Sequence, residues 1–157
     1  MQSESLSQTP TQTQRQDWMA ILSQADWSDL EHLWQELPKK PKSEILRKPE
    51  TGMVMVRGRM GGSGQPFNTG EATVTRCSVK TSSGVKGHAY VMGQNKAHAL
   101  IAAELDAGLQ APDFHTDLIE KVISPLQMIR AERLEKHRRK TAATKVDFFT
   151  LVRGEDD

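Results

Sequence analysis

The N-terminal part of the chain carries two helical patterns of hydrophobic residues. Over residues 15–24 hydrophobic side chains recur every three or four positions, which predicts an amphipathic helix. A second pattern runs to Leu37, and Ser28 followed by Glu31 has the spacing of a capping box at its start. Pro38 ends this pattern, because proline lacks the backbone N–H that a helix interior needs. We therefore expect two N-terminal helices followed by a stiff connection.

After Pro49 the period of the pattern changes to two, as in β-strands. Residues 53–60 predict a first strand, residues 71–81 a second and residues 85–92 a third. A Ser-Ser-Gly turn signal at residues 82–84 separates the second strand from the third. Such short loops join antiparallel strands, because a parallel pair needs a crossover of about a dozen residues.

The C-terminal part returns to helical spacing and then ends in a β-prone run. Asn95 is placed to cap a helix that ends near Gly108, and residues 114–140 form a longer helical pattern. Pro125 falls inside this longer pattern, so we expect a kink or a split there. Residues 146–152 read Val-Asp-Phe-Phe-Thr-Leu-Val, which favours a fourth strand. The predicted class is α+β, with N-terminal helices, a four-stranded mainly antiparallel sheet and kinked C-terminal helices.

Length and composition indicate one domain whose hydrophobic core is completed by a partner. The chain has 157 residues, near the commonest single-domain size, and its first residues offer almost nothing to bury. We therefore expect a disordered tail over residues 1–14 and a single α+β domain over residues 15–157. Only 36% of the residues are hydrophobic, whereas ordering each residue costs about 1–2 kcal/mol that burial must offset. This shortage predicts that partner subunits complete the fold.

Charge and cysteine content argue against several classes of function. Lys and Arg number 21 and Asp and Glu 20, so the net charge of +1 gives no general attraction to nucleic acid or an anionic membrane. The single cysteine, Cys77, allows no internal disulfide, no cysteine-rich zinc site and no cysteine-held iron–sulfur cluster. No stretch approaches the roughly twenty hydrophobic residues that span a bilayer, and the N-terminus lacks the pattern of a signal peptide. We expect a cytoplasmic chain without a metal or cofactor of its own.

A glycine-rich run flanked by arginines is the main candidate for chemistry. It reads Arg57-Gly-Arg-Met-Gly-Gly-Ser-Gly, and Gly61, Gly62 and Gly64 could present backbone N–H groups to an anion. The run matches neither the dinucleotide-binding motif nor the P-loop, because no helix start and no Lys-Ser/Thr ending accompany it. The alternative is a mobile or bulged connection between strands whose arginines lie in water or pair with Glu71, and the residues alone favour it.

Other candidate groups carry weaker signals. Thr75 and Arg76 resemble an anion-binding set, but alternating threonines are also ordinary strand residues on a partly solvated face. The basic run over residues 130–140 is interleaved with Glu132 and Glu135, which indicates a solvated helical face more than a nucleic-acid site. No Ser-His-Asp set and no pair of carboxylates has the pattern of a catalytic site.

Three segments of the chain resemble a known protein family. Residues 49–76 read Pro-Glu-Thr-Gly-Met-Val-Met-Val-Arg-Gly-Arg-Met-Gly-Gly-Ser-Gly-Gln-Pro-Phe-Asn-Thr-Gly-Glu-Ala-Thr-Val-Thr-Arg, and residues 144–155 read Thr-Lys-Val-Asp-Phe-Phe-Thr-Leu-Val-Arg-Gly-Glu. Both segments, and the opening Arg15-Gln-Asp-Trp-Met, are similar to the PhnG family, the G subunit of the bacterial carbon–phosphorus lyase core complex. The resemblance covers nearly the whole chain after the tail.

The resemblance implies an accessory subunit of a multisubunit transferase and lyase system in phosphonate catabolism, inactive alone. With the H, I and L proteins, such a chain supports transfer of the ribose triphosphate part of ATP onto a phosphonate, with release of adenine. The core complex it implies has two copies each of the G, H, I and J subunits, and hence a homodimer of this chain within the complex. Metal and the iron–sulfur cluster would lie in the I and J subunits, and neither membrane nor nucleic acid is an expected partner.

Two sets of contact residues are expected in such an assembly. Contacts to an anion or to a sister subunit are expected at Arg57, Arg59, Gly61, Gly62, Gly64, Thr75 and Arg76. Of these two roles, pairing of the arginines with carboxylates of the I subunit is favoured. Interface contacts are expected at Trp18, Trp34, Phe148 and Phe149. The alternative function is a stand-alone nucleotide- or RNA-binding module, which would bind with a steep dependence on salt.

Overall fold

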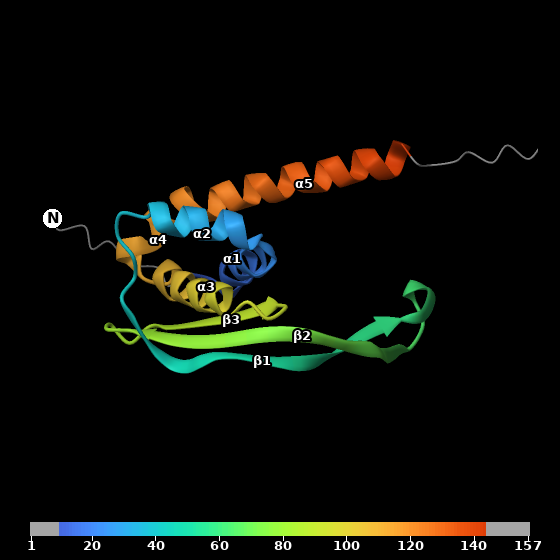
Figure 1. The fold of residues 1–157 in the computed structure, drawn as a ribbon, viewed down its shortest axis with the longest axis horizontal. Helices are drawn as coiled ribbons and strands as arrows, with labels where there is room; N and C mark the ends of the chain where they lie inside the picture. Colours follow the sequence, from blue (N-terminus) through green and yellow to red (C-terminus); the bar gives the residue numbers. More distant parts are fainter. Residues whose placement is uncertain (1–9, 144–157) are drawn as a thin grey trace, which may run out of the picture.

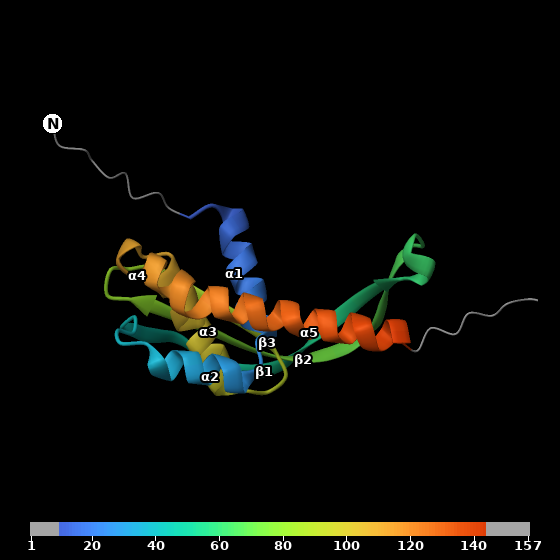
Figure 2. The same ribbon diagram turned by 90° about the horizontal axis from the view of Figure 1, so that it is seen from above.

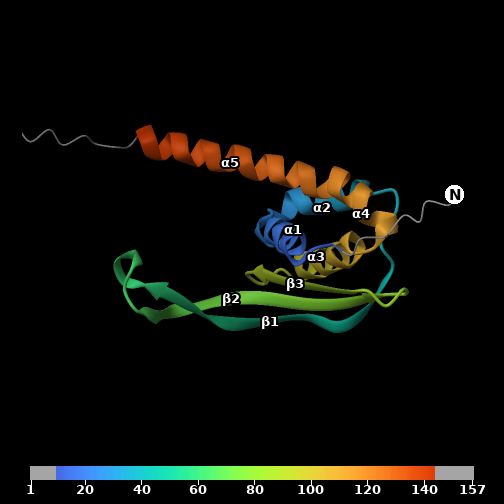
Figure 3. The same cartoon turned by 180° about the vertical axis from the view of Figure 1, so that it is seen from behind.

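A three-stranded antiparallel sheet, covered by helices on one face, forms the framework of the protein (Figure 1). The computed structural model describes residues 10–143. The elements are, in order, α1 (Gln12–Gln24), α2 (Trp27–Glu36), β1 (Ser43–Arg59), η1 (Met60–Gly62), β2 (Pro66–Thr81), β3 (Lys86–Met92), α3 (Lys96–Leu109), α4 (Pro112–Leu118), η2 (Ile119–Ile123) and α5 (Ser124–Ala143). α3 lies directly on the sheet, α1 packs against α3 and β3, and α2 and α5 lie above them (Figures 1 and 3). The predicted α+β class is confirmed.

The strands pair in the order β1-β2-β3, and the first two are longer than predicted. β1 begins at Ser43 because residues 43–47 pair with the end of β2. It does so although it contains Pro49, a residue of low β-propensity. The register of β1 shifts on both sides of Arg47. β1 is an edge strand, and Pro49 is tolerated there because no hydrogen bond to β2 requires a backbone N–H at that position. The predicted fourth strand, residues 146–152, lies outside the described residues.

Two predicted helix starts were wrong, and local hydrogen bonds explain why. α1 begins at Gln12 instead of Arg15, because Thr11 and Gln14 form a capping box in which each side chain accepts from the other's backbone N–H. Residues 12–14, counted with the predicted tail, belong to α1. α2 begins at Trp27 after the N-cap residue Asp26, so Ser28 does not start a capping box.

The two C-terminal helices are joined by a π-helical segment, residues 119–123. Pro125 is the second residue of α5, directly after this segment, so the helical hydrogen bonding changes where proline removes a donor. The predicted kink itself stays a prediction. Hydrophobic side chains remain buried across the change in helix type, including Leu118, Val122 and Leu126.

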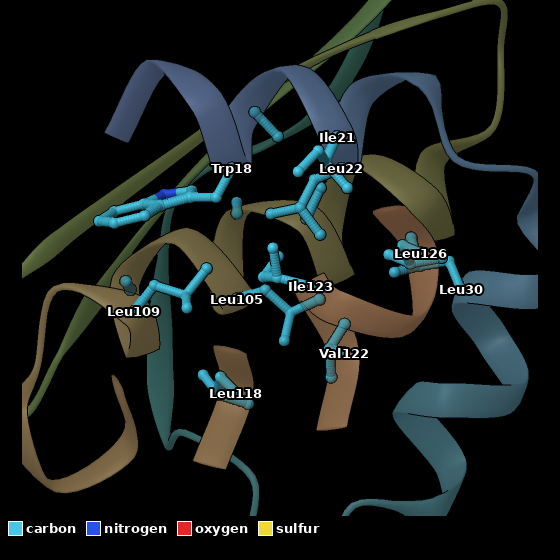
Figure 4. Packing of buried hydrophobic residues seen from close by; sticks show 14 of the residues in the cluster. Trp18, Ile21, Leu22, Leu30, Leu105, Leu109, Leu118, Val122, Ile123 and Leu126 are labelled. Atoms are coloured by element: carbon cyan, nitrogen blue, oxygen red, sulfur yellow. The ribbon is translucent and has the colours of Figure 1, made fainter. Parts of the chain in front are cut away.

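Helix-to-helix packing forms the larger part of the core (Figure 4). Leu22 of α1, Leu105 of α3, Val122 and Leu30 belong to this core cluster, and all four residues are at most 2% exposed. Small residues bring α3 close to the sheet. A Cβ at Gly87 would lie only 2.0 Å from the carbonyl oxygen of Ala103, so only glycine fits there.

The buried carboxylate of Asp106 joins three elements. Its oxygens accept hydrogen bonds from Arg15 Nε at 3.1 Å and Nη2 at 2.7 Å, and from the indole N–H of Trp18 at 2.9 Å. They also accept from the backbone N–H of His88 at 2.9 Å. Asp106 therefore connects α3 to α1 and to β3. It also accepts from a backbone N–H on the edge strand β3 that pairs with no other strand.

We predict that Asp106→Asn lowers the free energy of unfolding by about 2–4 kcal/mol, because the amide cannot accept from all these donors and leaves Arg15 without its counter-charge. Urea unfolding followed by circular dichroism measures the loss. Arg15→Gln is the matched comparison and should cost less, because the Arg15 side chain is 32% exposed and water can replace its bonds. Equal stability of Asp106→Asn and the unaltered protein would contradict this role.

A second prediction concerns Glu104 of α3, which accepts a hydrogen bond from the Ser43 hydroxyl at 3.0 Å. Burial raises the pKa of Glu104, and the Ser43 hydrogen bond and the charge of Lys40 offset this only in part. The folded chain thus binds this proton more tightly than the unfolded chain. The resulting stabilisation is complete below the ordinary glutamate pKa and is lost as pH rises through the raised value.

Glu104→Gln should therefore be more stable than the unaltered protein at pH 7, and this gain should disappear near pH 4. Urea midpoints of both proteins at the two pH values test the sign. Glu120→Gln, on an exposed position, is the control and should show no such difference. A gain at pH 4 that equals the gain at pH 7 would contradict the role of the buried charge.

Candidate functional site

The first two strands continue past the core as a two-stranded arm, here defined as residues 50–71 (Figures 1 and 3). Pairing between β1 and β2 persists to Arg59 and Pro66, with one register shift between Val56 and Arg57. Every residue of the arm is exposed except Gly58 and Gly64, which are half-buried. The arm thus has no core of its own beneath it.

Large hydrophobic side chains occupy both faces of the arm. Met53 and Met55, 63% and 55% exposed, lie on the face that continues the helix-covered side of the sheet. Val54 and Val56 lie on the opposite face, because successive strand residues alternate. Met60 and Phe67 near the tip are exposed as well. Exposed apolar residues that gather in this way are typical of surfaces that contact other proteins.

The glycine-rich run forms the turn at the tip of the arm. Gly61 and Gly62 have φ values of 60° and 80°, in the left-handed region that favours glycine. The Gly64 N–H donates to the Met60 carbonyl at 2.9 Å, and Arg59 donates to the Gly64 carbonyl at 3.2 Å. These bonds close a hairpin connection, and no ion pair with Glu71 forms among the described residues. Contact of the run with an anion or a sister subunit stays a prediction.

The structure separates the residues predicted to contact an anion. Arg57 and Arg59 lie near the tip of the arm. Thr75 lies at its base and is fully buried, and its hydroxyl donates to the Gly93 carbonyl at 2.7 Å. Arg76 points to the opposite face of the sheet, where it pairs with Glu50 at 3.4 Å. Thr75 and Arg76 thus face opposite sides of the sheet, and contact of either residue with an anion or a sister subunit stays a prediction.

The predicted interface residues also differ in their surroundings. Trp18 is 2% exposed and bonded to Asp106, so it belongs to the core of this chain and presents no surface to a partner. Trp34 is half-buried against the core, with the Lys40 ammonium 5.2 Å from its ring centroid. Phe148 and Phe149 lie outside the described residues.

The second half of α5 extends in the same direction as the arm (Figures 1 and 2). Arg133 pairs with Asp26 and Asp29 of α2, and this is where the helix leaves the body. All residues from 134 to 142 are exposed. They include four cations and one carboxylate, Glu135, which pairs with Arg139 as the interleaved charges predicted.

Other site types find little support in the part of the chain that is described. No three His, Cys, Asp or Glu side chains there are grouped to hold a metal ion. Cys77 is buried and burial raises the pKa of its thiol, so it does not resemble an activated nucleophile. Residues 10–143 contain no helix long and apolar enough to cross a membrane.

Sequence reasoning found the strands of the arm but missed its exposure. A run of four hydrophobic residues, Met53 to Val56, was the available signal. Such a run places apolar side chains on both faces of a strand, which requires cover on both sides. No helix within residues 10–143 supplies that cover.

Comparison with known proteins relates the chain to phosphonate metabolism. A family described as "Phosphonate metabolism protein PhnG" matches residues 13–154. A relative from Rhizobium meliloti (strain 1021), the "Alpha-D-ribose 1-methylphosphonate 5-triphosphate synthase subunit PhnG", is 44% identical over 146 residues. The match covers 91% of each chain.

We predict that Thr75→Val lowers the free energy of unfolding by about 1–2 kcal/mol, because it removes the buried hydroxyl bond to Gly93. Thr73→Val, at a half-buried position two residues away, should change it by less than about 0.5 kcal/mol. Urea unfolding measures both. If Thr75→Val kept full stability but lost a ligand or a partner, the buried structural role would be wrong.

Proposed function

Because the chain belongs to the PhnG family of phosphonate metabolism proteins, we propose that it is a subunit of a synthase of the kind named for its relative. In that assembly it supports transfer of the ribose triphosphate part of ATP onto a phosphonate, with release of adenine. Nearly complete coverage of both chains supports the same role for the whole subunit. We assign it an accessory role, which the burial of Cys77 and the lack of a metal-binding group within residues 10–143 support.

The arm is the observation that carries this proposal. A two-stranded hairpin is marginally stable by itself in water, and this one exposes hydrophobic residues on both faces. Full burial of one such side chain stabilises by about 1.5–3 kcal/mol. Six of them, Met53 to Val56 with Met60 and Phe67, can offset an association cost of about 4–15 kcal/mol. The arm is therefore suited to insertion between surfaces of sister subunits.

Charge indicates the chemistry of the surface that receives the arm. Arg57 and Arg59 have no carboxylate partner among the described residues, and the projecting half of α5 is also basic. A complementary surface would be apolar at its centre and rimmed by carboxylates. We assign this surface to the I subunit. The H and J subunits, a second copy of this chain and the L protein complete the proposed assembly and reaction.

Coexpression tests the function itself. A tagged copy expressed with its sister subunits should recover a stable complex that releases adenine from ATP in the presence of methylphosphonate. The chain alone should release none. Activity of the purified single chain would contradict the accessory role, and recovery of the tagged chain without partners would contradict the subunit assignment.

We predict that Met53→Lys with Met55→Lys lowers recovery of the sister subunits at least tenfold, because it places two charges where an apolar contact is needed. The free energy of unfolding should change by less than about 0.5 kcal/mol, since both side chains are exposed in the free chain. Affinity capture from coexpressing cells gives the measurement.

Ile45→Lys with Leu46→Lys is the matched control for the arm. These residues of β1 are 48% and 50% exposed but lie before the arm. The control should recover the complex normally. If both double variants recovered the sister subunits as well as the unaltered chain does, the arm would not be part of the interface.

A further inference from the structure

No helix covers the face of the sheet opposite α3 within the described residues (Figures 1 and 3). The strand register places polar residues in cross-strand rows on this face. Cys77, Val79, Ala89 and Val91 point toward α3 and are buried. Alternate residues of the same strands therefore point to the open face. The register places three such rows side by side across β2 and β3, which are Arg76 with Tyr90, Ser78 with His88, and Lys80 with Lys86.

The central row contains a hydroxyl, an imidazole and a guanidinium. The Ser78 hydroxyl oxygen lies 2.9 Å from Nδ1 of His88, and both side chains are half-buried. Arg47 of β1 is paired opposite Ser78 on its other side. β1 shifts register on both sides of Arg47, but the pairing of Arg47 with Ser78 places it beside Ser78 on the flank that His88 leaves open.

Cations surround this central row. Arg76 precedes Ser78 on the same face and Lys80 follows it, with Lys86 beside Lys80. Two carboxylates of β1 oppose them: Glu50 lies 3.4 Å from Arg76, and Glu44 lies 3.8 Å from Lys80. These ion pairs are exposed and long, so they contribute little to stability and can yield to a stronger anion. Within residues 10–143 no carboxylate pairs with Arg47 or Lys86.

We propose that this open face binds a small oligophosphate anion, with one phosphoryl group over Ser78 between Arg47 and His88. Arg47 offers a guanidinium fork that matches phosphate oxygens. Ser78 and a neutral His88 share one hydrogen bond and leave one further donor, which is the Ser78 hydroxyl when Nδ1 carries the proton and Nε2–H when Nδ1 accepts. Arg76 and Lys80 meet the neighbouring phosphoryl groups. This site is separate from the arm and does not rest on the subunit assignment.

The spacing of the rows favours a chain of phosphoryl groups over a single phosphate. Residues two apart on one strand face lie about 6.6–6.8 Å from each other, and neighbouring strands lie about 4.8 Å apart. The cations therefore extend along β2 on both sides of Ser78, farther than one phosphate reaches. A monophosphate would engage the central row alone and leave Lys80 and Lys86 unused.

Titration of the full ¹⁵N-labelled chain with inorganic triphosphate tests the proposal. We expect saturable shifts at the backbone amides of Arg47, residues 76–80 and residues 86–90, and at least tenfold weaker binding of inorganic phosphate. Arg47→Gln with Ser78→Ala should weaken triphosphate binding at least tenfold. Arg138→Gln, which removes an equally exposed arginine from α5, should change it less than twofold.

Three outcomes would overturn the site. Shifts concentrated on residues 134–142, or equal weakening by Arg138→Gln, would mean general attraction to basic surface. Absence of saturation at millimolar triphosphate would mean that no site exists. Loss of sister-subunit capture by the Arg47 and Ser78 variant would make the open face a protein interface instead. The map of amide chemical-shift changes in the unaltered chain tests the site even if the variant fails to fold.

Discussion

A buried carboxylate is stable only if its oxygens accept hydrogen bonds from the protein. Those of Asp106 accept from two neighbouring elements, α1 and β3. Arg15 and Trp18 approach from α1, and the backbone of His88 approaches from the edge of β3. The full set of bonds forms only when α1 and β3 are both in place beside α3. The requirement to satisfy one buried charge thus couples the helical core to the sheet, and other contacts between these layers are mainly non-directional apolar packing.

Placing all helices on one side of the sheet divides the molecule into a body and two projections. The body supplies the buried core, while the arm and the second half of α5 extend beyond it with little contact to the rest (Figure 2). This division explains how a chain with few hydrophobic residues can leave several of them exposed. Stability resides in the body, and the projections are free to serve recognition.

Sequence periodicity predicted much of this body. Period-two alternation located β2 and β3, and Asn95 correctly marked the start of α3, where its side chain accepts from the His98 N–H. The first part of β1 was not predicted, because its strand structure comes from pairing with β2 and not from local propensity. Trp18 was assigned to an interface because Asp106, 88 residues away, gives no signal in its neighbourhood.

The π-helical segment before α5 holds one more residue than regular α-helical geometry would place there. Since each residue of an α-helix turns the chain by about 100°, that single addition sets the angular phase of everything after it. Loss of one residue from this segment would spin the projecting helix by more than a quarter turn. Arg133 would then face away from α2, and the whole basic surface would point in a new direction without any change in its composition.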